Sequence, residues 1–248
     1  MPGLSSEERA TREGSGSKRP AGERADQHSE RGQQSERGQQ SERKTEMLRA
    51  ALEVIVERGY ADTRIADVAE RTGTSPALVI YYFKTRDQLL TEAVRYSEDS
   101  WYAECLQRLE EITSAAGRLT ELVAMTCLPG TDPEPRSWWL LWLDLWALSP
   151  RNPGVSAVRQ KSDERWRETI RSIVLAGQEV GEFASVDVDD FAITLSALLD
   201  GLAVQIALED PQVPPQRTYE LAMRFAASQL GFDWDTAPAA KRARKRGS

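Results

Sequence analysis

The sequence is poor in the side chains on which many enzymes and metal proteins depend. Its 248 residues include one histidine and two cysteines. The histidine, His28, lies in a polar N-terminal segment, so the rest of the chain offers no imidazole as a general base or metal ligand. Cys105 and Cys127 are too few for a disulfide framework and indicate a reducing environment. Because a glycine-rich phosphate loop is also missing, we expect no enzyme activity, no cofactor and no metal site.

Long hydrophobic runs are missing as well. The most apolar window, Trp138–Leu148, is far shorter than the roughly 20 residues of a transmembrane helix, and it contains Asp144. The charged N-terminus has no apolar stretch of the kind found in signal peptides. We therefore expect a cytoplasmic protein without a membrane partner.

Positive charge is scarce in the chain as a whole, which has 32 basic and 39 acidic residues and a net charge of −7. The acidity is concentrated in residues 96–240, where 11 basic and 23 acidic residues give −12. Residues 45–95 have a net charge of −1, and the last eight residues have +5. Since electrostatic steering to DNA depends on the local face of a protein, the acidic total does not exclude a nucleic-acid partner.

Composition and periodicity predict an all-α fold in four segments. Residues 1–41 are polar and contain the repeat Ser29–Gln34 and Ser35–Gln40, so we expect a disordered tail there. Residues 42–95 and 96–232 carry helical periodicity without persistent strand-like alternation, and 233–248 read as a flexible basic tail. The predicted helices cover 43–58, short segments as far as 83, then 85–113, 119–128, 137–148, 155–180, 188–209 and 215–230.

The segment 63–83 predicts a helix-turn-helix. Gly73 supplies a tight turn between two short helices, and Ser75 followed by Pro76 is typical of an N-cap and a first helical residue. In the second helix Val79 and Phe83 are four apart and face inward. The opposite face then consists of Ala77, Ile80 and Tyr81.

This geometry suits DNA, because the second helix of such a motif enters the major groove. Lys84 and the capped helix start at Thr85 combine a cation with free backbone N–H groups for a phosphate. Arg64, at the start of the first short helix, is placed to clamp the other side of the groove. From the residues alone, simple packing of three short helices stays open as the alternative.

Residues 43–94 resemble the DNA-binding domain of TetR-type transcriptional regulators. The resembling pieces are Ala50-Ala51, Arg58-Gly-Tyr60, Ile65-Ala-Asp-Val-Ala-Glu70, Gly73-Thr-Ser75, Tyr81-Tyr-Phe83 and Arg86-Asp-Gln-Leu-Leu90. By that resemblance the residues that contact DNA are Arg64, Ser75, Pro76, Ala77, Tyr81, Tyr82 and Lys84.

The chain also departs from the family pattern. Ile80 stands where Tyr is most common and Leu78 where Thr is common, so apolar contacts to thymine methyl groups are expected and the operator sequence stays open. Arg86 replaces a frequent Lys. Tyr82 has a second interpretation, a half-buried role in holding the domain together.

Residues 96–230 resemble, more loosely, the subgroup of betaine-operon regulators, which implies an all-α domain for ligand binding and dimerisation. The last two long helices are more apolar than one packing face requires, and two glycines allow close helix contact. The expected dimer interface contains Ile170, Ile173, Val174, Gly177, Leu198, Gly201 and Leu202. Filling of a monomer core by these residues is the alternative.

Tryptophans form the remaining signal. Trp138, Trp142 and Trp146 share one helix face, and aromatic walls with a few polar groups are typical of small-molecule sites. The candidate pocket consists of Trp101, Met125, Trp138, Trp142, Trp146 and Trp166, with Tyr102 a further candidate. Ordinary core packing is an equal alternative, and a cationic ligand is the chemistry that aromatic rings near a carboxylate would favour.

Together these patterns predict a homodimeric, ligand-responsive, DNA-binding transcriptional regulator. The partners are double-stranded operator DNA, a second copy of the chain and a small-molecule effector. A repressor released by its ligand is the leading hypothesis. A transcriptional activator, or a dimeric sensor without specific operator binding, are the alternatives.

Overall fold

A computed structural model describes residues 21–128 and 135–234 of the chain, with side chains from residue 38 onward except that of Pro135. It has two units, residues before Thr45 and residues from Thr45 on, and each is described by itself. The described residues form helices and loops without a strand, so the predicted all-α class is confirmed. The expected break at 129–133 and the basic residues 241–246 lie outside the described part.

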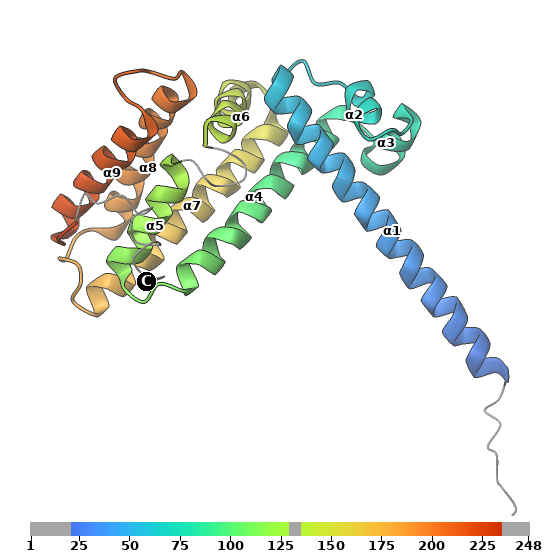
Figure 1. Cartoon of the computed structure of the whole chain (residues 1–248), viewed down its shortest axis with the longest axis horizontal. Coiled ribbons are helices and arrows are strands. Elements are labelled where there is room, and N and C mark those ends of the chain that lie inside the picture. The colour runs from blue at the N-terminus through green and yellow to red at the C-terminus, as the bar shows by residue number, and fades with distance from the viewer. Residues whose placement is uncertain (1–20, 129–134, 235–248) are drawn as a thin grey trace, which may run out of the picture. The chain divides into compact units, whose positions relative to one another are not determined.

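Helix α1, Ala21–Arg58, begins well before the predicted start at residue 43 (Figure 1). It continues through the hexapeptide repeat, a stretch for which we expected disorder. The difference has a physical reason: Glu, Arg and Gln are good helix formers, and extending an existing helix costs far less than nucleating one. In the second unit, α1 buries the apolar residues Met47, Ala51, Val54 and Ile55. It ends at Gly59, whose φ of +86° is a left-handed conformation that favours glycine.

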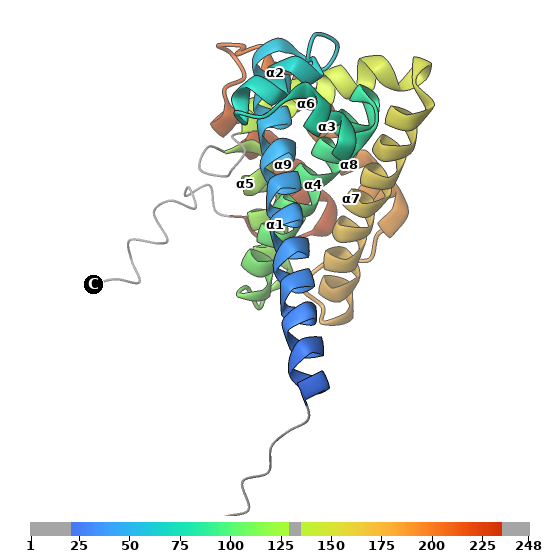
Figure 2. The ribbon, with the colours of Figure 1, turned by 90° about the vertical axis from the view of Figure 1, so that its right-hand side faces the viewer.

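Helices α2, Ile65–Arg71, and α3, Pro76–Phe83, form the predicted helix-turn-helix and pack against each other (Figure 2). Gly73 turns the chain between them with φ +62°. The Ser75 hydroxyl caps α3 by accepting a hydrogen bond from the Leu78 backbone N–H at 3.2 Å. The predicted inward residues Val79 and Phe83 are both buried.

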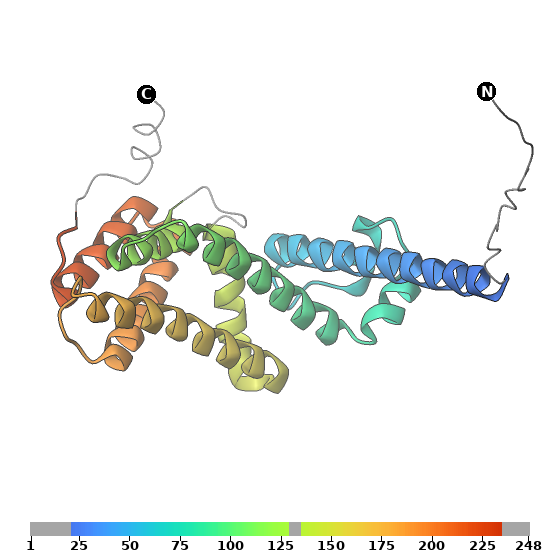
Figure 3. The same cartoon turned by 90° about the horizontal axis from the view of Figure 1, so that it is seen from below.

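Helix α4, Arg86–Glu110, crosses the expected boundary at residue 95 without interruption. Thr85 caps it by accepting a hydrogen bond from the Gln88 backbone N–H at 3.1 Å. As Figure 3 shows, α4 is a continuous rod between the helix-turn-helix and the C-terminal helices. These are α5 (Ala115–Cys127), α6 (Pro135–Leu148), the short η1 (Ser149–Arg151), α7 (Pro153–Glu179), α8 (Val188–Ala207) and α9 (Pro215–Leu230).

Helix α8 is at the centre of the C-terminal packing, since it contacts α6, α7 and α9. Among the described residues it is also the one helix long and apolar enough, by length and composition, to cross a membrane, with a mean hydropathy of 1.4. The prediction that long hydrophobic runs are missing is therefore wrong for α8. Packing accounts for the composition of α8, because Phe191, Leu195 and Leu199 are core residues.

Candidate DNA-binding surface and ligand cavity

The outer face of α3 carries large apolar and aromatic side chains that lie outside the buried core. Ile80 is 46% exposed and Tyr81 is 63% exposed, whereas Val79 and Phe83 on the other side are 0% and 1% exposed. Ala77, Ser75 and Pro76 are also exposed, at the N-terminal end of the same helix. An exposed apolar helix face of this kind needs a partner surface, and the N-terminal end of the helix is the part that such motifs place against bases.

Lys84 and Arg64 flank this face. Lys84 follows α3 with φ +60°, a left-handed conformation uncommon for a lysine, and its Nζ donates to the Tyr81 carbonyl at 2.8 Å. Arg64 is the exposed residue before α2, and its backbone N–H donates to the Asp67 carboxylate at 2.9 Å. Both cations are therefore at the ends of α2 and α3, beside the exposed face of α3.

Tyr82 differs from the other predicted DNA-contacting residues because its side chain is half-buried against the core. Its ring meets that of Tyr81 edge-on, with centroids 5.5 Å apart. The structure thus brings seven of the eight predicted residues to the exposed surface and places Tyr82 behind them, as support for Tyr81.

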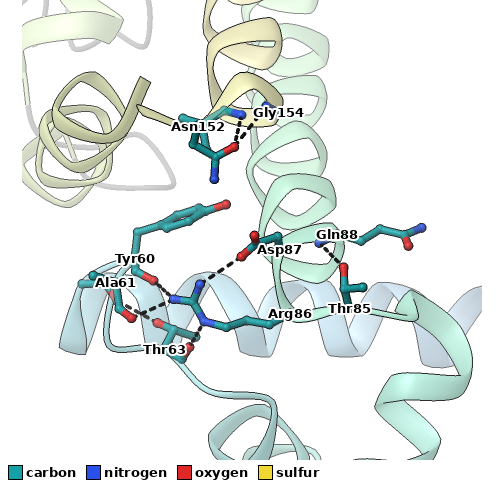
Figure 4. Close-up of polar contacts among 11 residues, drawn as sticks. Tyr60, Ala61, Thr63, Thr85, Arg86, Asp87, Gln88, Asn152 and Gly154 are labelled. Carbon is teal, nitrogen blue, oxygen red and sulfur yellow. Dashed lines mark hydrogen bonds and ion pairs between the residues drawn. The ribbon is translucent and has the colours of Figure 1, made fainter. Parts of the chain in front are cut away.

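Arg86 is a residue whose role the sequence did not reveal. Its guanidinium donates to the backbone carbonyls of Thr63 at 2.6 Å, Ala61 at 2.8 Å and Tyr60 (Figure 4). These carbonyls belong to the loop 59–63 that joins α1 to α2. The planar fork of arginine suits several acceptors at once, and the first residue of α4 thereby holds the loop that precedes the helix-turn-helix.

A cavity lies between α4, α5, α6, α7 and α8, and its empty space of about 790 Å³ includes its opening to solvent. All six residues of the predicted pocket line it: Trp101, Met125, Trp138, Trp142, Trp146 and Trp166. Other lining residues were not predicted, among them Trp139, Glu98, Ser162, Asp163, Arg167 and Asp200.

The tryptophan rings form a connected wall. Trp101 lies 6.5 Å from Trp138 and 6.0 Å from Trp166, centroid to centroid. Along α6, Trp142 lies 6.0 Å from Trp138 and 6.1 Å from Trp146. Aromatic faces present negative potential, so several of them around one space make that space more favourable for positive charge.

Carboxylates add to this potential. Glu98 is only 7% exposed and faces the same cavity as Trp101, which follows it by one helical turn on α4. Burial raises the pKa of the Glu98 carboxyl to about 7, although the Ser162 hydroxyl and Arg165 favour its ionised form. Burial likewise raises the pKa of Asp163. Glu98 belongs to no recognisable motif, so it was not predicted as a site residue. Its spacing of three residues from Trp101 is the feature that places both on the same face of α4.

Basic side chains around the cavity already have acidic or aromatic contacts. Arg165 donates to Asp99 at 2.8 Å and lies over the Tyr102 ring at 3.8 Å. Arg159 forms an ion pair with Asp163. Arg167 lines the cavity, where it faces Asp163 and Asp200. The lining therefore has three carboxyl groups and one guanidinium.

The seven residues predicted for the dimer interface fall into two groups. Ile170, Ile173, Val174 and Gly177 are buried within this chain. A Cβ atom added at Gly177 would lie 2.2 Å from the Phe183 ring, so an intrachain contact already accounts for this glycine. The second group consists of Leu198 and Leu202, which are half-buried, and Gly201, which is exposed.

The outward face of α8 continues from Gly201. Ile193 is 52% exposed, Leu208 is 68% exposed, and Ala197 lies between them on the same side. A Cβ atom added at Gly201 would meet open space. No group of three potential His, Cys, Asp or Glu metal ligands occurs within the described ranges.

Comparison with known proteins agrees with this arrangement. Residues 47–93 match the family of bacterial regulatory proteins, tetR family, and residues 115–231 match the C-terminal domain of BetI-type transcriptional repressors. The HTH-type transcriptional regulator BetI of Escherichia coli K12 is 28% identical over 195 residues, which cover 77% of this chain and 95% of BetI.

Solved structures give the same result. A transcriptional regulator from Saccharomonospora viridis, crystallised with choline, is 31% identical with a TM-score of 0.71, over 77% of this chain and 98% of that one. A TetR-family regulator from Rhodococcus sp. is 27% identical with a TM-score of 0.68, over 77% and 99% of the two chains. With a helix-turn-helix, a C-terminal helical domain and these relatives, the chain belongs to the TetR family of transcriptional regulators and has a BetI-like C-terminal domain.

Proposed function

We propose that this chain is a homodimeric, cytoplasmic repressor that leaves its operator when a quaternary ammonium cation of the choline class binds the tryptophan cavity. As a TetR-family member it is a ligand-responsive DNA-binding regulator and not an enzyme. The observation that carries the ligand class is the convergence of five predicted tryptophans and the buried Glu98 on one cavity.

The cavity lining favours a cation over a zwitterion. A trimethylammonium group is apolar in surface and positive in charge, and both properties match tryptophan faces beside carboxylates. Glycine betaine has the same head group but adds a carboxylate, which Glu98, Asp163 and Asp200 would repel. The choline complex of the Saccharomonospora viridis regulator supports this choice.

Isothermal titration calorimetry tests the ligand class directly. We expect choline and tetramethylammonium to bind, and glycine betaine to bind at least about tenfold more weakly. The neutral isostere 3,3-dimethylbutan-1-ol is the matched control because it has the shape of choline without the charge. Equal binding of choline and its neutral isostere would show that the cavity recognises shape alone and would refute the cationic ligand.

We propose that α3 reads the major groove, with Ala77, Ile80 and Tyr81 against base edges and Lys84 and Arg64 on phosphates. The exposure of Ile80 and Tyr81 supports this assignment. In a gel shift with DNA from around its own gene, Tyr81→Ala and Lys84→Ala are expected to abolish the specific band at constant salt. Lys161→Ala, on the exposed surface of α7, is the charge-matched control. Binding that is equally weak to all DNA and indifferent to both changes would favour a sensor without operator recognition.

We propose that the partner copy covers the α8 face formed by Ile193, Ala197, Gly201 and Leu208. Two α8–α9 pairs joined across a two-fold axis form a four-helix interface. Such a dimer places two recognition helices about one DNA turn apart, 34–36 Å. Gly201→Arg is expected to shift sedimentation from dimer to monomer, whereas Lys161→Ala leaves it unchanged. A Gly201→Arg protein that stays dimeric would place the interface elsewhere.

A transcription assay with the operator placed over a promoter distinguishes a repressor from an activator. A repressor lowers transcript yield, and choline restores it. A yield that rises on addition of the protein would identify an activator that uses the same domains.

A further inference from the structure

One side chain links the tryptophan-rich helix to the DNA-binding part of the chain. The Asp144 carboxylate on α6 accepts a hydrogen bond from the Tyr60 backbone N–H at 2.7 Å, across 84 positions of sequence. A hydrogen bond to an ionised acceptor is about twice as strong as a neutral one. Gly59 permits this approach, because a Cβ atom there would lie 3.3 Å from the same carboxylate oxygen.

Arg86 holds the same loop through the backbone carbonyl groups of the loop. Its guanidinium binds the carbonyls of Tyr60, Ala61 and Thr63, as Figure 4 shows, and lies 5.6 Å from the centroid of the Tyr60 ring. Residues 59–63 are thus attached to α6 through an N–H group and to α4 through carbonyl groups. One charged side chain makes each attachment.

Both of these helices line the cavity. Helix α4 contributes Glu98 and Trp101, and α6 contributes Trp138, Trp142 and Trp146. At 100° per residue, Asp144 lies about 160° around α6 from Trp142 and Trp146 and about 120° from Trp138. The cavity therefore contacts one face of α6, and the 59–63 loop is bound to the opposite face. Asp144 itself does not line the cavity.

We infer that Asp144 is the positioning residue that transmits ligand binding from the cavity to the DNA-binding helices. This inference rests on the proposed function. A cation that draws α6 and α4 together, or pushes them apart, changes the distance between the two attachments of the loop. The loop leads into α2 at Ile65, and α2 packs on α3, so the orientation of the reading helix changes with it.

The coupling has a measurable definition. It is the ratio of operator affinities without and with saturating choline, and by thermodynamic linkage the same ratio describes the effect of operator on choline affinity. Values of about 5- to 150-fold are typical of such couplings. A merely structural role for Asp144 would lower stability or operator affinity while leaving this ratio unchanged.

The experiment compares Asp144→Asn and Asp144→Ala with the wild type. Operator affinity is measured by fluorescence anisotropy with and without choline, and choline affinity by calorimetry. We expect choline affinity within about twofold of wild type and a coupling ratio that falls at least about fivefold. Asp189→Asn is the control, since it removes another hydrogen-bonded aspartate, on α8 beside Arg171, and should leave the ratio unchanged.

The outcomes separate this inference from the proposed function. A wild-type ratio of one refutes both, because choline is then not an effector. A wild-type response that both Asp144 variants retain in full refutes the inference alone.

Amide hydrogen exchange in the wild type provides a test that does not depend on the folding of a variant. Choline is expected to change the exchange rate of the Tyr60 amide. An unchanged rate would overturn the inference.

Discussion

Trp101 on α4 and Trp138 on α6 face each other with ring planes 14° from parallel and centroids 6.5 Å apart. Two helices that are both attached to the 59–63 loop are thus in contact through these rings in the cavity wall. A ligand that packs on either ring therefore lies next to the place where α4 and α6 meet. Trp138 is therefore the first residue to substitute in a test of ligand binding.

Replacing Trp138 by Leu is expected to weaken choline binding about tenfold, because one aromatic face is lost while apolar volume is largely kept. Calorimetry gives the affinity, and operator binding without ligand should stay unchanged. Trp234→Leu is the control, since Trp234 packs on Tyr219 at 5.7 Å and does not line the cavity. Equal loss in both variants would indicate general destabilisation rather than a ligand contact.

Glu98 predicts a pH dependence of ligand binding. Its pKa of about 7 means that the carboxyl is largely protonated below neutral pH, and a bound cation favours the ionised form. Choline affinity is therefore expected to rise about tenfold from pH 6 to pH 8 and then to level off. Glu98→Gln should bind choline weakly and without this pH dependence. A wild-type profile that is flat across neutral pH would remove Glu98 from the binding site.

The same group affects stability with a defined sign. Its folded pKa of about 7 exceeds its ordinary value of 4.5, so the folded protein binds more protons between these values. The free energy of unfolding contributed by Glu98 therefore decreases as pH rises from 4.5 to about 7 and is constant above that. Urea unfolding at several pH values gives the free energy of unfolding at each pH. This free energy should change less with pH in Glu98→Gln than in the wild type.

Gly177→Ala is expected to lower the free energy of unfolding by about 1–3 kcal/mol, because its methyl group would overlap the Phe183 ring. Thermal unfolding followed by circular dichroism measures the loss. Adding Phe183→Leu should recover part of it by making room. Gly201→Ala is the contrasting change, since its methyl group meets open space and should cost no monomer stability.

Ser75→Ala is expected to cost about 1 kcal/mol, the usual value for a lost helix N-cap. The reason is the Ser75 hydroxyl, which accepts from the Leu78 N–H at 3.2 Å. Chemical denaturation measures the change, and Ser75→Asp should keep the stability because a carboxylate also caps. Equal stability of all three proteins would contradict a capping role.

Local signals were enough to predict the helix-turn-helix. Gly73, Ser75 and Pro76 act within a few residues of their own positions, and the alternation of Val79 and Phe83 with Ile80 and Tyr81 reports helix faces directly. The tryptophan grouping was predictable for the same reason, since three of its members share one face of a single helix.

Contacts between distant segments were not predictable. Asp144 was recognised only as a charge within an apolar helix, because nothing in its neighbourhood points to Tyr60. The roles of Arg86 and Glu98 likewise depend on how α4 packs. Gly177 was assigned to a partner chain, although Phe183, six residues later, already fills the space beside it.

The attachment of the 59–63 loop by Asp144 and Arg86 has a consequence for how such a protein diversifies. The α2–α3 pair has its own interior at Val68, Val79 and Phe83, and the cavity has its own lining on other helices. Substitutions that alter the effector and substitutions that alter the operator therefore fall on separate residues. As long as Asp144 and Arg86 are kept, a cavity that has changed to bind a new effector can still control binding to the original operator.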